Sequence, residues 1–216
     1  MSGSLQARLA HLARSQNGAC ESVQDIINIA ATAEALAVTA MGGALQSAID
    51  GNLDLNEEQQ QVVAAARAAE QTHYDFLVGA GAEALTLEFT LPDEAIVTDV
   101  GTLITTVVGL EEAFIAAYMA AAQTFAILGE PDLVAYSLQT AAVEGEHRAH
   151  MRFYGLLAGL YEETPNNIAF HKGMFTSVGG AAQALTDLGW IGGSGAVLSF
   201  PGPGEVDLSI IENLQP

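Results

Sequence analysis

Two long apolar stretches of this chain each carry acidic residues near the middle and no basic residue to pair with them. Residues 26–49 contain Glu34 as their only charged residue, and residues 101–129 contain only Glu111 and Glu112. Both stretches are long enough to cross a bilayer, which takes about 20 apolar residues. They are rich in alanine, glycine and threonine, however, and no Lys/Arg clusters flank them as the positive-inside rule requires. We therefore expect buried helices of a soluble bundle and no membrane partner.

Composition excludes several classes of protein. Half of the 216 residues are apolar, which favours one folded domain with a real core, and 26 acidic against 6 basic residues give a net charge of −20. Such a surface cannot neutralise a phosphate backbone, so nucleic acid is not expected as a partner. The single cysteine, Cys20, excludes an intrachain disulfide and a cysteine-based metal site. Residues 1–17 lack the apolar core of a signal peptide, so a cytoplasmic protein is expected.

Four long helices are predicted from their start and stop residues. Asn56 precedes an acidic first turn, Gly129 follows the third apolar segment, and Pro131 lies where a first helical turn tolerates proline. The expected helices cover residues 22–49, 56–79, 102–128 and 131–160. Short turns join the first to the second and the third to the fourth, so each pair should form an antiparallel hairpin.

A longer connection, residues 82–101, lies between the two hairpins and shows strand-like alternation at residues 85–89. A segment of this length can cross a bundle from end to end. Two hairpins joined by one long crossover is the connectivity of ferritin-like four-helix bundles. The sequence thus predicts an all-α fold with this connectivity.

The last part of the chain differs in composition, being rich in glycine and proline. Within it a short helix is expected near residues 181–188, with extended pieces around residues 196–200 and 206–211. The predicted organisation is an N-terminal segment (1–21), the helical bundle (22–161) and a C-terminal extension (162–216). We expect the extension to pack on the bundle or at an oligomer interface.

The chemistry is expected where the acidic residues and histidines recur along the four helices. The second predicted helix contains Glu70-Gln71-Thr72-His73 and the fourth contains Glu144-Gly145-Glu146-His147. Residues three apart share a helix face, so each Glu-x-x-His offers a carboxylate and an imidazole to one side. One Glu from each of two helices plus Glu-x-x-His from each of the other two is the ligand set of carboxylate-bridged dinuclear bundles. The candidate ligands are Glu34, Glu70, His73, Glu111 or Glu112, Glu144 and His147.

Simpler interpretations exist for each of these residues taken alone. Glu70 lies at helical spacing from Arg67, and Glu144 from Arg148, so each could form an ion pair within its own helix. His150 is expected beside the site or at the surface, and Tyr118 is expected to pack in the core. The joint pattern over four successive helices favours the metal site, because four carboxylates balance two divalent cations.

Four short motifs resemble the ferritin-like superfamily, and within it the bacterial and plant desiccation-related proteins. They are Ile27-Asn28-Ile29-Ala30 before Glu34, Glu70 to Leu77, Leu110-Glu111-Glu112 before Ala117-Tyr118, and Val143 to His147. This resemblance covers residues 22–160. It implies a dinuclear metal centre, selects Glu111 as the ligand of the third helix, and makes Glu70 and Glu144 the carboxylates that bridge the metals.

The expected cofactors are two divalent transition-metal ions, iron ahead of manganese. Such a centre is predicted to react with oxygen or peroxide as an oxidase, a ferroxidase or a catalase-like enzyme. The alternative is a stress- or desiccation-protection scaffold whose metal is structural. An iron-storage cage is disfavoured, since no shell-forming exterior can be recognised. The apolar composition also favours a homo-oligomer.

Overall fold

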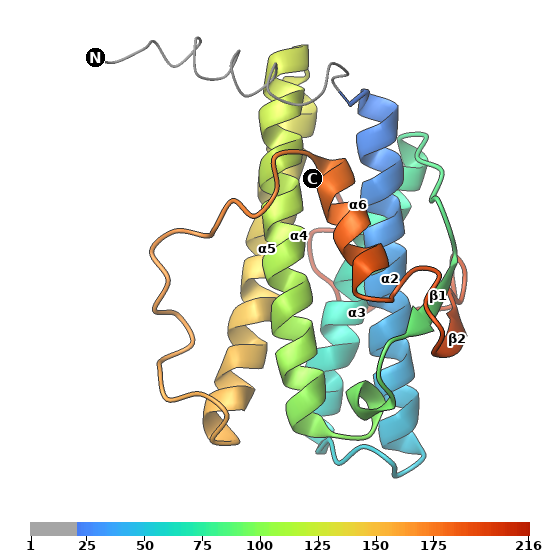
Figure 1. Ribbon diagram of the computed structural model, residues 1–216, viewed down its shortest axis with the longest axis vertical. Helices are drawn as coiled ribbons and strands as arrows, with labels where there is room; N and C mark the ends of the chain where they lie inside the picture. Colours follow the sequence, from blue (N-terminus) through green and yellow to red (C-terminus); the bar gives the residue numbers. More distant parts are fainter. Residues whose placement is uncertain (1–20) are drawn as a thin grey trace.

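The computed structural model describes residues 21–216, so the predicted N-terminal segment lies outside the described residues except for Glu21. The described chain is mostly helical, as expected for an all-α fold. Four long helices lie side by side (Figure 1). They are α2 (Val23–Ile49), α3 (Glu57–Gly79), α4 (Val100–Leu128) and α5 (Pro131–Leu157).

The helix starts are set by side chains that satisfy free backbone N–H groups. Ser22 and Asn56 each form a capping box with the residue three positions later, at the starts of α2 and α3. Asp99 accepts a hydrogen bond from the backbone of Thr102, so α4 begins at Val100, two residues earlier than predicted. Pro131 occupies the first turn of α5, as predicted.

Two glycines end helices in the left-handed conformation that other residues rarely adopt. Gly129 has a φ of +85° and closes α4, as predicted. Gly159 has a φ of +74°, and α5 ends at Leu157 rather than at the predicted residue 160. The prediction placed the end of this helix three residues too far along the chain, because Gly159 reverses the chain before the apolar pattern stops.

The helices pack mainly as two hairpins, α2 with α3 and α4 with α5. Contacts between α2 and α4, and between α3 and α5, are sparse. The crossover between the hairpins contains the strand β1 (Glu88–Leu91) and the 3-10 helix η1 (Glu94–Val97). The two hairpins share one buried core, which contains residues of all four helices.

The C-terminal region packs on the helices. Helix α6 (Val178–Asp187) contacts α2 and α4, and strand β2 (Ala196–Ser199) pairs antiparallel with β1, so that Phe89 lies opposite Leu198 (Figure 1). The strand predicted at residues 85–89 is thus shifted to residues 88–91.

The prediction of an extended piece at residues 206–211 was wrong, because this segment forms turns. The Asp207 carboxylate accepts a hydrogen bond from the Ser209 backbone, and the Ile211 N–H donates to the Leu208 carbonyl. An aspartate that bonds the backbone two residues later stabilises a turn in place of a strand.

Helices α2 and α4 are long and apolar enough to cross a membrane when judged by length and composition alone. Core helices of soluble proteins pass the same test. In the most apolar window of α2, 61% of the residues are buried against the rest of the described chain. The core around them contains Leu36, Phe89 and Ile115, and it also contains four glutamates.

Candidate metal centre

The six predicted ligands lie on four helices and converge on one point of the core. Glu34 lies near the middle of α2 and Glu111 near the middle of α4. Glu70 and His73 lie one turn apart on α3, and Glu144 and His147 are placed in the same way on α5. The four carboxylates are buried, with 0–1% of each residue exposed. A buried carboxylate is costly unless it is protonated, paired or coordinated.

Neither arginine forms the ion pair that the simpler interpretation assigned to it. Arg67 Nε donates to the Val38 carbonyl at 3.1 Å instead of pairing with Glu70. Arg148 donates from Nε and Nη2 to Glu112 Oε1, at 3.0 and 2.8 Å, so it does not neutralise Glu144. Glu112 is 41% exposed and turns away from the cluster. Of the two acidic neighbours on α4, Glu111 is therefore the one beside the other buried carboxylates.

Each histidine faces three carboxylates through its Nδ1 atom. His73 Nδ1 lies 3.3 Å from Glu70 Oε2, 3.6 Å from Glu144 Oε1 and 3.6 Å from Glu34 Oε2. His147 Nδ1 lies 2.9 Å from Glu70 Oε1, 3.4 Å from Glu144 Oε2 and 3.7 Å from Glu111 Oε1. Glu70 and Glu144 thus direct one oxygen toward each histidine.

The donors form two overlapping groups, in each of which the ligand atoms lie within 4.8 Å of one another. One group comprises Glu34, Glu70, His73 and Glu144, and the other comprises Glu70, Glu111, Glu144 and His147. Each group offers three carboxylates and one imidazole, a donor set that suits divalent transition metals. The described residues therefore form a buried carboxylate and histidine cluster that could hold metal.

Several atoms of this cluster that could ligate a metal lack a hydrogen-bond partner among the described residues. They are Glu34 Oε2, Glu70 Oε1, Glu111 Oε2, both carboxylate oxygens of Glu144, and His147 Nδ1. His147 Nδ1 and Glu70 Oε1 lie 2.9 Å apart, but the contact does not have the geometry of a hydrogen bond. Buried polar atoms without partners are rare in folded proteins and call for an explanation such as a bound ion. A cation at the shared focus of these lone pairs would satisfy them.

Burial and mutual repulsion shift the carboxylate pKa values strongly. Burial raises the pKa of Glu34, and the negative charge of Glu70 adds to the effect. Burial is the largest cause of the raised pKa of Glu111, and the negative charge of Glu144 adds to it. The pKa of Glu144 is also raised, mainly by burial and then by the charge of Glu70. For Glu70 burial acts in the same direction, but His147 and His73 outweigh it and lower its pKa.

The neighbouring carboxylates raise the pKa values of both histidines. Burial acts to lower the pKa of His73, but Glu34 and Glu70 outweigh it and raise the value. In the same way, Glu144 and Glu70 raise the pKa of His147 to about 10. His147 therefore retains its proton at neutral pH in the metal-free cluster, and a cation that binds to its Nδ1 atom has to displace that proton.

Tyr118 on α4 has a role that the sequence did not predict. It was expected to pack in the core, and it is buried, but its hydroxyl also donates a hydrogen bond to Glu34 Oε1. The other oxygen of Glu34, Oε2, faces His73. Tyr118 therefore orients this carboxylate. The spacing of seven residues from Glu111 was the signal, because it places the hydroxyl two turns along the same helix face.

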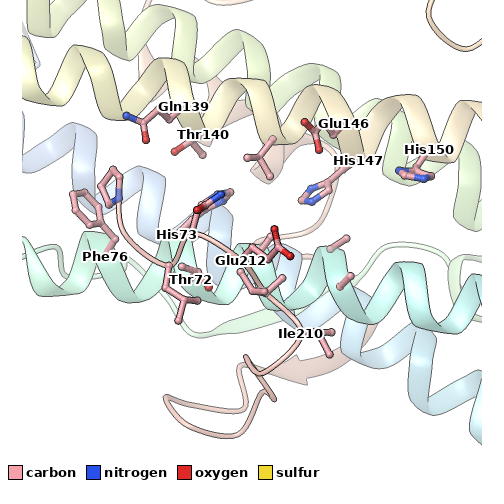
Figure 2. Close-up of a pocket in the computed structure, with 18 of the residues that line it drawn as sticks. Thr72, His73, Phe76, Gln139, Thr140, Glu146, His147, His150, Ile210 and Glu212 are labelled. Carbon is pink, nitrogen blue, oxygen red and sulfur yellow. The ribbon is translucent and has the colours of Figure 1, made fainter.

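The histidine side of the cluster opens on a cavity between α3 and α5. This cavity is lined by both histidines, by Glu146 and His150 of α5, and by residues 210–216 (Figure 2). Neither Glu146 nor His150 belongs to the two donor groups, and His150 lies beside the site, as expected. The position of residues 210–216 could not be predicted, because nothing in their sequence points to this groove.

No protein-family model, curated protein or solved structure matches this chain. Its function must therefore be argued from the cluster and its surroundings.

Proposed function

We propose that this protein is a ferritin-like dinuclear metal protein that binds two transition-metal ions, iron ahead of manganese, and reacts with oxygen or peroxide. The observation that carries the proposal is the pair of donor groups that share Glu70 and Glu144. A carboxylate with one oxygen toward each of two histidine-bearing groups has the arrangement of a bridging ligand. The two hairpins and the connection between them are consistent with the ferritin-like class.

In this proposal Glu34 and His73 would complete the site of one ion, while Glu111 and His147 would complete the site of the other. Four carboxylates and two cations of charge +2 give a neutral centre, which removes the cost of the buried negative charge. Two such ions would supply the electrons that reduce oxygen or peroxide, each ion passing from the divalent to the trivalent state.

The protein residues have separable tasks around this centre. The helix packing keeps water away from the four carboxylates, since each of these residues is at most 1% exposed. Tyr118 keeps the proton of its hydroxyl beside Glu34. The pKa of Tyr118 is raised, mainly by burial and then by the negative charge of Glu34. His73 and His147 have side chains that are 12% exposed, so they face the side from which a reactant would arrive.

The cavity beside the two histidines favours a reactive centre over a structural one. A metal that only staples the helices needs no access from outside, whereas a redox centre needs room for its oxidant next to the metal. The cavity has a volume of about 530 Å³ and its lining includes both histidines. It therefore supports an oxidoreductase ahead of a stress-protection scaffold.

The experiment is to load the metal-free protein with Fe²⁺ or Mn²⁺ without oxygen, then add peroxide or oxygen. We expect a charge-transfer absorption band and consumption of the oxidant at a rate above that of the free ion. Glu70→Gln should abolish both effects, whereas Glu130→Gln, a matched change at an exposed residue, should not. Tight metal binding without either effect would support the scaffold, and failure to bind metal would refute both functions.

A further inference from the structure

The cavity between α3 and α5 is larger than an oxidant of two or four atoms requires. Its volume of about 530 Å³ lies within the range of small-molecule sites, about 300–1,000 Å³. A dioxygen or peroxide molecule is about the size of one or two waters, each of roughly 30 Å³, and would fill a small part of it. The space is therefore suited to an organic molecule.

One end of the cavity meets the candidate metal centre. Figure 2 shows His73 from α3 and His147 from α5 at the cavity wall, with the C-terminal segment that carries Ile210 and Glu212 passing alongside. The carboxylates of the cluster are sealed from solvent, whereas the two histidine side chains are 12% exposed. A molecule in the cavity would thus lie next to the metals on their accessible side.

The walls are mainly apolar and include an aromatic pair. Phe76 and Tyr136 are stacked, with ring centroids 4.4 Å apart and an interplanar angle of 19°. Small side chains on α3, Ala65 and Ala69, leave space along the floor. The other apolar residues that line the cavity include Met41, Val62, Val107, Val143 and Met151. These walls would take an apolar or aromatic body.

The side chains that line the cavity and carry an unpaired charge are acidic, because the two histidines at its end already face the buried carboxylates of the cluster. Among its lining residues the acidic side chains are Glu146 and Glu212, and none is a lysine or an arginine. Neither carboxylate takes part in an ion pair within the described residues. An organic anion would be repelled, while an ammonium group would find two unpaired carboxylates and the faces of aromatic rings.

We propose that this cavity binds an organic amine, with its apolar body against α3 and the aromatic pair and its ammonium group facing Glu146 and Glu212. Its role as the substrate site rests on the proposed function of the metal centre. The binding itself does not, because every group that would contact the amine is present without metal.

The test compares three probes that share a phenylethyl body: 2-phenylethylamine, 2-phenylethanol and 3-phenylpropionate. Titration calorimetry on the metal-free protein measures their affinities. We expect the amine to bind at least about threefold more tightly than the alcohol and at least about tenfold more tightly than the carboxylate. The double variant Glu146→Gln with Glu212→Gln should erase the advantage of the amine over the alcohol, and Ala65→Phe should weaken both. Glu130→Gln controls for the change of net charge.

The outcomes separate the two proposals. Equal or tighter binding of the carboxylate, or no binding of any probe at about 10 mM, overturns the amine site whatever the metal centre does. Selective binding of the amine by a protein that takes up no metal would refute the proposed function and leave the amine site standing. The Ala65→Phe variant keeps both lining carboxylates, so binding of the amine in it with unchanged affinity would also contradict the assigned cavity.

Discussion

Loading the metal-free protein should release protons, and the number follows from the pKa shifts in the cluster. Metal ligands must be deprotonated, so each proton held by a ligand has to leave when the cation enters. With a pKa of about 10, His147 is neutral in only about one molecule in a thousand at about pH 7. The pKa of His73 is also raised, so the two imidazoles alone should release about two protons.

The carboxylates add to this number. Glu34, Glu111 and Glu144 have raised pKa values and Glu70 has a lowered one, so any of the first three that is protonated in the metal-free cluster would release its proton as well. The two histidines alone set a lower bound of about two protons for full loading. Metal affinity should accordingly fall steeply as the pH falls.

Calorimetric titration with Co²⁺ in buffers of different ionisation enthalpy measures this release directly. The slope of the observed enthalpy against the buffer ionisation enthalpy is the number of protons released. A slope near zero would show that the metal binds to groups that are already deprotonated, such as surface carboxylates, and would refute the reasoning. The exposed variant Glu130→Gln should give the wild-type slope.

The melting temperature of the metal-free protein should fall as the pH rises from about 6.5 toward 10, because His147 binds its proton more tightly when folded than when unfolded; thermal melts check this, and a rising melting temperature contradicts it. Equilibrium dialysis should show that Glu34→Ala weakens the binding of one ion, whereas Glu70→Ala weakens both; equal effects would contradict the shared role of Glu70. Tyr118→Phe removes the buried donor to Glu34 and should destabilise the protein by about 1–3 kcal/mol in denaturant unfolding, while no change would show that the hydroxyl orients nothing.

Much of the architecture could be predicted from the sequence because it depends on local signals. Ser22 and Asn56 cap their helices through residues only three positions away, and Gly129 reverses the chain through its own φ. The Glu-x-x-His spacing is equally local, and it puts Glu70 beside His73 whatever the rest of the chain does. The convergence of four helices on one point was an inference from the repetition of this pattern.

The features that could not be predicted depend on contacts between distant residues. Strand β2 pairs with β1 across more than a hundred residues, and Glu21 accepts hydrogen bonds from the N-terminal backbone of α6, at Val178 and Gly179. Arg148 lies four residues from Glu144, yet it reaches Glu112 on the neighbouring helix. Helical spacing shows which partners are within reach of a side chain, but packing decides which one it takes.

The most direct test of the account is the anomalous scattering of crystals grown from metal-loaded protein, recorded at the absorption edge of the bound metal. We expect two peaks per chain, one near Glu34 and His73 and the other near Glu111 and His147, with the carboxylates of Glu70 and Glu144 contacting both. A single peak, or peaks only at surface carboxylates, would contradict it.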